Sequence, residues 1–217
     1  MKLMGLLRGD LRFQYRYGFY FVYVLFSLLY VCLLSVFPAS WRTNASILMI
    51  FSDPAALGLF FMGAIVLFEK SERVLDSLAV SPVRVHEYVA SKLLSLSVIS
   101  VLVALLLAFF GGILKAPLVF ISGVFLSSCF FSSLGLILAV RSATLNEFML
   151  NTIPVEVVVM VPGFLYLFGW NPFWLLLHPG AAAIEVLSGG PSAVVALLIL
   201  MFWTALSMYL SCRASSK

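Results

Sequence analysis

The chain has 217 residues, of which 63% are apolar and only 10% are charged, and its mean hydropathy is +1.14. A soluble domain is about half apolar and about a quarter charged, so a water-soluble globule of this composition would expose large apolar patches. The same composition excludes disordered, collagen-like and disulfide-framework proteins. The chain is therefore expected to be an integral membrane protein without a large soluble domain.

Residues 1–17 are expected to form an amphipathic helix that lies in the membrane interface. Arg8, Arg12 and Arg16 recur every four residues and form a basic stripe that suits anionic lipid headgroups. Leucine and aromatic side chains fall on the other side of this helix. Two interpretations stay open: a topology anchor, or an elbow helix that braces the cytoplasmic side of a transport domain.

Residues 18–217 are predicted to form one all-α transmembrane domain with six spans. Pro117 and Pro154 suit the first turns of two spans, where a missing N–H costs little. Pro162 predicts a kink or break inside the fifth span. The apolar runs place the spans at about residues 18–36, 51–68, 93–114, 117–140, 154–168 and 193–210.

Lysine and arginine residues are divided unequally between the two ends of these spans. Of the 13 basic residues, Arg42 and Lys115 fall on one side and the other 11 on the opposite side. Because cytoplasmic segments carry the excess of Lys and Arg, both termini are predicted to be cytoplasmic in a multi-pass protein of the cell membrane. The net charge of +4 is interpreted as this topology signal, and not as a sign of nucleic-acid binding.

The predicted cytoplasmic loop at residues 69–92 is dense in charges of both signs. Its first part can form a helix with an apolar face, which Ser81-Pro82 would end. A second helix would then lead through Glu87 and Lys92 into the third span. A helix-turn-helix at the membrane surface is expected, and a solvated charged loop is the alternative. The first helix could pair charges spaced three or four residues apart, namely Glu69, Glu72, Arg73 and Asp76.

Few residues suggest chemistry within the chain itself. There is no Gly-rich phosphate loop of the G-x-x-x-x-G-K-[ST] type, so ATP hydrolysis by that route is not expected. The two histidines fall in loops on opposite sides and the three cysteines in separate apolar runs, so no metal site is expected. Glu156, near the start of the predicted fifth span, is either stabilised by the helix dipole or faces a substrate path or a partner subunit.

The loop at residues 69–92 resembles that of the ABC type-two exporter permeases. Residues 10–20, 51–54 and 69–73 are similar to the fluoroquinolone-export permease group of small six-span chains. One departure is Val74-Leu75, which replaces the usual Gly-Thr after the acidic cluster. The positions that match the loop pattern are Glu69, Glu72, Arg73, Leu78, Ser81, Pro82, Glu87 and Lys92.

The resemblance implies that the loop carries a coupling helix that docks on an ABC ATPase subunit. It also implies a re-entrant hairpin at residues 169–192, which contain no Lys or Arg and are interrupted by Pro and Gly. An interfacial loop with aromatic anchors is the alternative for that segment. The expected complex holds two permease chains, identical or different, and two ATPase subunits. ATP and Mg²⁺ would bind to the ATPase, whereas this chain would bind no cofactor and would not be an enzyme.

The expected function is export of a hydrophobic or amphipathic substrate, such as a drug, a lipid or a hydrophobic peptide. The scarcity of charge inside the spans favours such cargo. Haem-export permeases have the same size and span count and remain an alternative. A stand-alone secondary transporter or channel would show more polar groups in its spans and internal repeats. An intramembrane enzyme or a membrane scaffold is disfavoured because no polar cluster is evident.

Overall fold

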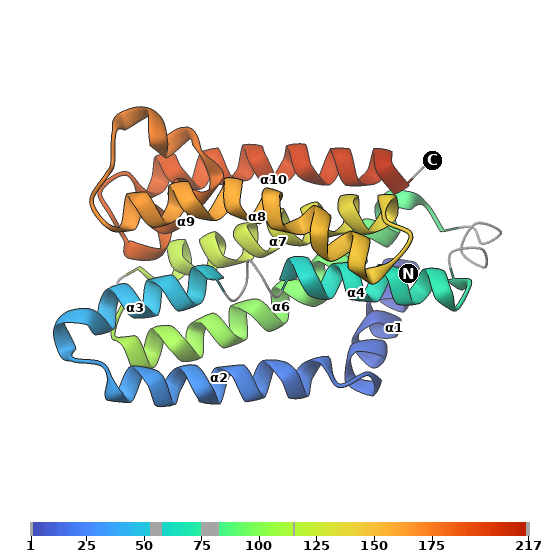
Figure 1. Cartoon of the computed structure of the whole chain (residues 1–217), viewed down its shortest axis with the longest axis horizontal. Helices are drawn as coiled ribbons and strands as arrows, with labels where there is room; N and C mark the ends of the chain where they lie inside the picture. The colour runs from blue at the N-terminus through green and yellow to red at the C-terminus, as the bar shows by residue number, and fades with distance from the viewer. Residues whose placement is uncertain (1, 53–57, 75–82, 115, 216–217) are drawn as a thin grey trace.

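The computed structural model describes residues 2–52, 58–74, 83–114 and 116–215. These ranges fold into an elongated helical bundle, and both chain termini lie at the same end, on the right of Figure 1. The all-α prediction is confirmed for these residues. In chain order the elements are α1 (Lys2–Arg16), α2 (Phe19–Val36), α3 (Ala39–Ser52), α4 (Gly58–Ser71), α6 (Val85–Gly111), α7 (Pro117–Arg141), α8 (Leu145–Leu167), the 3₁₀ helix η2 (Phe173–Leu177), α9 (Pro179–Ser188) and α10 (Ala193–Ser215).

Within these ranges, five helices are long and apolar enough to cross a membrane: α2, α6, α7, α8 and α10. They correspond to the predicted first, third, fourth, fifth and sixth spans. α6 begins at Val85, ahead of the predicted residue 93, so the second helix expected in the charged loop is the first part of α6. The Glu87 carboxylate accepts a hydrogen bond from the backbone N–H of Arg84 (3.0 Å) and closes this helix start.

The second span was predicted at residues 51–68, where the structure describes the end of α3 and the larger part of α4. The region contains two helices of 14 residues each, α3 and α4, and residues 53–57 between them lie outside the described residues. A helix of that length is about 21 Å long, shorter than the hydrocarbon core of about 30 Å. α3 lies almost entirely outside the predicted spans. It ends at Ser52, two residues ahead of Pro54 in the sequence, as helices before a proline usually do.

The fifth predicted span, residues 154–168, also needs correction, because α8 begins at Leu145. The Thr144 hydroxyl caps this start by accepting a hydrogen bond from the backbone N–H of Glu147 (3.2 Å). Pro154 therefore lies inside the helix and not in its first turn, and α8 continues through Pro162 without a break. Transmembrane helices tolerate such prolines because neighbouring groups satisfy the freed backbone carbonyls.

α7 is the central helix of the bundle, and it packs against α4, α6, α9 and α10. Its small residues let these neighbours come close. At Gly135 an added Cβ would lie 2.4 Å from the backbone oxygen of Leu59 in α4. Such contacts between small residues are the usual way in which helices associate in lipid, where the hydrophobic effect does not drive them together.

Hydroxyl groups add hydrogen bonds across the same central helix. Thr204 and Ser211 of α10 donate to the backbone oxygens of Leu126 (3.1 Å) and Ser133 (3.0 Å) of α7. On the other side of α7, the Ser128 hydroxyl donates to Ser100 of α6 (3.0 Å). Close backbone approach and buried hydroxyls thus join the long helices in addition to their buried apolar side chains.

At the end opposite to the termini, η2 and α9 fold back along the bundle (Figure 1). The indole N–H of Trp203 donates to the backbone oxygen of Leu177 (2.9 Å), which ties η2 to α10. Gly180 of α9 faces α8 so closely that an added Cβ would lie 2.1 Å from the backbone oxygen of Val159. The buried Glu185 carboxylate accepts hydrogen bonds from the Tyr166 hydroxyl (3.0 Å) and the Ser192 N–H (2.8 Å), which joins α8, α9 and the start of α10.

We expect Gly135→Ala to destabilise the protein by about 1–3 kcal/mol, because the new methyl group overlaps backbone atoms that cannot rotate away. Thermal unfolding of the detergent-solubilised protein measures this effect. Gly9→Ala in α1 is the matched control, since a Cβ there meets nothing within 4 Å. Equal melting temperatures for the two variants would contradict the close α4–α7 contact.

Candidate functional site

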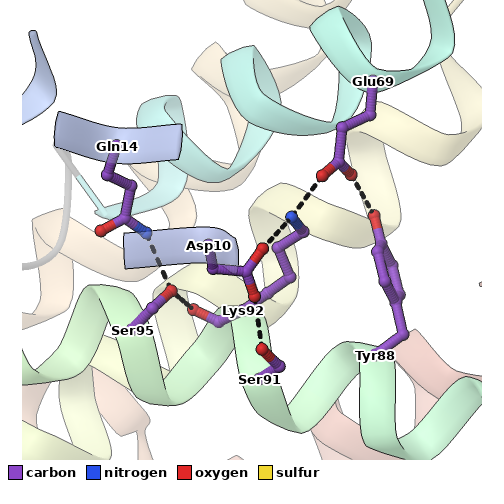
Figure 2. Close-up of polar contacts among 7 residues, drawn as sticks. All are labelled: Asp10, Gln14, Glu69, Tyr88, Ser91, Lys92 and Ser95. Atoms are coloured by element: carbon purple, nitrogen blue, oxygen red, sulfur yellow. Dashed lines mark hydrogen bonds and ion pairs between the residues drawn. The ribbon is translucent and has the colours of Figure 1, made fainter. Parts of the chain in front are cut away.

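A buried cluster of charged residues lies where α1, α4 and α6 meet, at the end of the bundle that carries the termini (Figures 1 and 2). At its centre is the ammonium group of Lys92 in α6, with a side chain only 2% exposed. It forms salt bridges with Asp10 of α1 (2.5 Å) and with Glu69 of α4. One lysine thus joins two carboxylates that lie on different helices and far apart in the sequence.

Neutral side chains of α6 complete the coordination of both carboxylates (Figure 2). The Tyr88 hydroxyl donates to the second oxygen of Glu69 (2.7 Å), and the Ser91 hydroxyl donates to the second oxygen of Asp10. The ammonium of Lys92 also lies 5.3 Å from the centre of the Tyr88 ring. Each carboxylate therefore binds the shared cation with one oxygen and a hydroxyl of α6 with the other.

A further hydrogen bond extends the contact between α1 and α6 by one helical turn. The Gln14 side chain of α1 donates to the Ser95 hydroxyl (2.8 Å), which in turn donates to the backbone oxygen of Lys92 (2.9 Å). α1 is therefore attached to the bundle by Asp10 and Gln14 on one face. Arg8, Arg12 and Arg16 are exposed, so the predicted basic stripe is free to face a membrane surface.

The charge balance of the cluster explains why these contacts are close. One cation is shared by two carboxylates, so the buried group carries an excess of one negative charge when all three are ionised. Burying an unpaired charge in a membrane protein is costly, and such residues almost always pair with one another. The hydroxyls of Tyr88 and Ser91 stabilise the excess charge by donating to it.

Lys70, the residue after Glu69, attaches the same turn of α4 to a different neighbour. Its ammonium donates to the backbone oxygens of Ala139 (2.8 Å), Val140 (2.7 Å) and Ser142 (3.0 Å). These carbonyls lie at the C-terminal end of α7, where the helix dipole favours a positive charge. Consecutive residues of opposite charge thus bind the last turn of α4 to α6 and α1 on one side and to α7 on the other.

Apart from Glu87, whose carboxylate accepts the Arg84 N–H at the start of α6, the residues predicted for the coupling loop divide into three groups. Glu69 and Lys92 are buried and paired with each other, so they do not present their charges to a partner subunit. Glu72 and Arg73 are exposed in the turn that follows α4, where Arg73 has a left-handed backbone (φ 53°). The helix predicted to pair them with Glu69 ends at Ser71 instead. Asp76, Leu78, Ser81 and Pro82 lie outside the described residues.

Sequence reasoning missed Asp10, Tyr88 and Lys70 as parts of this site. The signal for Asp10 was present, because it is the only acidic residue among the first 52 residues. It also lies on the side of residues 1–17 that carries Leu6 and Phe13, where a carboxylate needs a buried partner. That partner could not be identified without the fold, because Lys92 is 82 residues away.

Glu156, the other predicted polar position, lies in the middle of α8 and is partly buried. The interpretation that a helix N-terminus stabilises it is wrong, since α8 starts eleven residues earlier at Leu145.

As for metal ligands, in the part of the chain that the structure describes no three His, Cys, Asp or Glu residues are grouped so as to hold an ion.

A bundle of long apolar helices is the architecture of a multi-pass membrane protein. Comparison with known proteins identifies which class of membrane protein this is. The chain belongs to the fluoroquinolones export permease protein family, which it matches over residues 1–210. The resemblance seen in the sequence is thereby confirmed.

Two relatives are the fluoroquinolones export permease proteins of two Mycobacterium tuberculosis strains, CDC 1551 / Oshkosh and ATCC 25618 / H37Rv. Each is 30% identical to this chain over 179 residues, which cover 81% of this chain and 76% of the relative. The chain is therefore a membrane permease of a drug-export family.

Replacing the shared cation should destabilise the protein strongly. In Lys92→Gln, two buried carboxylates face each other without a counter-ion, and we expect a loss of about 3–5 kcal/mol. Adding Asp10→Asn and Glu69→Gln to Lys92→Gln removes both charges and should recover most of this loss. Thermal unfolding and detergent-extracted yield of the two proteins measure the difference. If the triple variant is no more stable than Lys92→Gln, the cost does not come from the unpaired carboxylates.

Proposed function

We propose that this chain is the transmembrane subunit of an ATP-driven ABC exporter. Two permease chains and two ABC ATPase subunits would form the working complex, and the ATPase subunits would bind ATP and Mg²⁺. The loop that follows α4 would dock on the ATPase. The observation that carries this proposal is the attachment of the last turn of α4, immediately before that loop, to three other helices.

This attachment supports a role in transmitting movement from the loop to the bundle. A displacement of the loop acts first on Glu69 and Lys70, which it directly follows. Glu69 passes it to α6 and α1 through Lys92 and Tyr88, and Lys70 passes it to the end of α7. Packed helices joined by such contacts move together as rigid elements, which suits a change between inward-open and outward-open states.

The orientation follows from the basic residues. The end of the bundle that holds the two termini and the start of α6 would be cytoplasmic, because the excess of Lys and Arg falls there. α1, with its exposed arginines, would be an elbow helix on the inner membrane surface. α3 and α4 would together make a divided second span, which completes six.

Residues 169–192 would form the re-entrant hairpin on the outer side. The contact of Leu177 with Trp203 supports this, because Trp203 lies ten residues into α10, or about 15 Å from its start. That depth is half of a hydrocarbon core of about 30 Å. The exposed apolar side chains of η2, such as Phe173 and Trp174, would then face lipid, and the buried α9 would lie within protein.

Glu156 would face a second permease chain or the substrate path. A carboxylate in the middle of an apolar helix is costly in lipid, and such groups almost always face protein or water. α8 is exposed along much of its length, which leaves room for a partner there. The proposed cargo is a hydrophobic or amphipathic drug, with fluoroquinolones as the first candidates given the relatives.

Two kinds of variant separate docking from transmission. We expect the double substitution Glu72→Ala/Arg73→Ala to weaken ATPase binding by about fivefold, as loss of exposed charge contacts usually does. We expect Glu69→Gln to leave ATPase binding unchanged but to lower the drug transported per ATP hydrolysed, because the link from α4 to Lys92 is weakened. Co-purification of the ATPase from native membranes and ATP-driven uptake into inverted vesicles measure the two effects.

Glu185→Gln is the matched control for Glu69→Gln, since this carboxylate also accepts a hydrogen bond from a tyrosine hydroxyl but joins α8, α9 and the start of α10 instead of α4 and α6. A chain that purifies without an ATPase and transports drug in liposomes without ATP would overturn the proposal in favour of a secondary transporter. Transport of haem in place of drug would favour the haem-export alternative.

A further inference from the structure

The face of α1 that points away from the bundle carries three arginines, and we call it the arginine face. Arg8, Arg12 and Arg16 follow one another at intervals of four residues, so they share one side of the helix, and all three are exposed. Asp10 and Gln14, which attach α1 to α6, lie two residues away from the arginines and hence about 200° around the helix axis (Figure 2). The arginine face and the attached face are therefore on opposite sides of one helix.

α1 is attached to the side of α6 and not to its end. Asp10 contacts Ser91 and Lys92, and Gln14 contacts Ser95. These residues of α6 lie six to ten residues after its start, or about 9–15 Å along the helix. The apolar run of α6 begins at the same level, at residue 93. α1 therefore lies beside the bundle where α6 becomes apolar, which is the level of the lipid headgroups in a membrane.

The chain enters its first membrane-spanning helix directly after the arginine face. Arg16 ends α1, Gly18 turns with a left-handed backbone (φ 77°), and α2 begins at Phe19. Three residues reach at most about 11 Å, so Arg16 stays close to the hydrocarbon core. Tyr15, which is 78% exposed, lies with its ring centre 6.3 Å from that of Tyr20, and tyrosine is enriched at the membrane interface. The arginine face thus meets headgroups at the side of the bundle, whereas a soluble partner would approach the end.

We propose that the arginine face binds anionic phospholipids, and that this binding stabilises the salt bridge between Asp10 and Lys92 on the opposite face of α1. A guanidinium group binds phosphate oxygens through two parallel N–H donors. An anionic lipid surface also strengthens binding about fivefold for each Lys or Arg near it. The lipid contact goes beyond the proposed function, and only its consequence for coupling to ATP hydrolysis rests on that function.

The lipid contact and the salt bridge are linked because they lie on one rigid helix. A rotation of α1 that breaks the salt bridge would turn Asp10 toward the headgroups and the arginines away from them. With anionic lipid the first change is repulsive and the second loses an attraction, so such lipid favours the attached helix. A ligand shifts an equilibrium only through a difference of this kind between the two states. Phosphatidylcholine, which carries no net charge, lacks it.

The test measures amide hydrogen exchange of the purified full-length permease in nanodiscs of phosphatidylcholine, with and without phosphatidylglycerol. We expect phosphatidylglycerol to slow exchange about tenfold in α1 and in the first three turns of α6. The variant Arg8→Gln/Arg12→Gln/Arg16→Gln should lose both effects, whereas substitution of the same three residues by lysine should keep them, because the charge is retained. Arg141→Gln removes an exposed arginine at the end of α7 and is the matched control, which should behave as wild type.

Asp10→Asn separates the lipid contact from the attachment to α6. It leaves the arginine face intact, so phosphatidylglycerol should still slow exchange in α1, but it removes the salt bridge, so exchange at the start of α6 should no longer respond to the lipid. In the complex with the ATPase, phosphatidylglycerol should raise the drug transported per ATP hydrolysed in wild type and not in the arginine-to-glutamine variant.

Three results would overturn the inference. Equal slowing by phosphatidylglycerol in wild type and in the arginine-to-glutamine variant would remove the arginine face as the lipid site. Slowing at the start of α6 that persists in Asp10→Asn would disconnect the lipid from the salt bridge. If wild-type exchange does not respond to the lipid and the arginine-to-glutamine variant loses the ATPase, the arginines bind a protein instead. The exchange measurements need no ATPase, so they decide the inference even where the proposed function fails.

Discussion

The ion pair network around Lys92 is the contact on which this end of the molecule depends. A lysine with a side chain 2% exposed persists in an apolar helix because two carboxylates bind it and hydroxyl groups bind them in turn. Its partners come from α1 and α4, so one buried cation sets the positions of three helices. No apolar contact would fix them so specifically, since hydrocarbon surfaces can slide over one another whereas a salt bridge has a defined length.

The last turn of α4 is anchored by this network through Glu69 and by the hydrogen bonds of the next residue, Lys70. Successive residues on a helix project about 100° apart, so Glu69 and Lys70 naturally reach different neighbours. Their opposite charges suit different targets: a carboxylate binds the lysine of α6, and an ammonium binds the carbonyls that end α7. The last turn of α4 therefore connects the charged loop to α1, α6 and α7 at the end of the bundle that is proposed to face the cytoplasm.

The other parts of the bundle are joined by different means. α7 contacts its neighbours through glycine, serine and backbone atoms as well as large apolar side chains such as Phe131, and α9 is enclosed by α8 and α10 through Gly180 and Glu185. At the sides of this packing there are apolar grooves, one of them lined by Val158 and Leu206.

The sequence by itself determined the membrane class, the family, four of the span positions and the charged loop, because composition, apolar run length and Lys/Arg distribution are local properties. It placed Glu69 and Lys92 in one functional loop but could not pair them with Asp10, since salt bridges between distant segments leave no periodic pattern. It also left most of α3 outside the predicted spans and started α8 at Pro154, because apolar run length does not register short helices or polar first turns. Tertiary structure alone decided that the loop's charged ends are buried anchors, because only the packing of α1 and α4 on α6 brings their carboxylates to the one lysine.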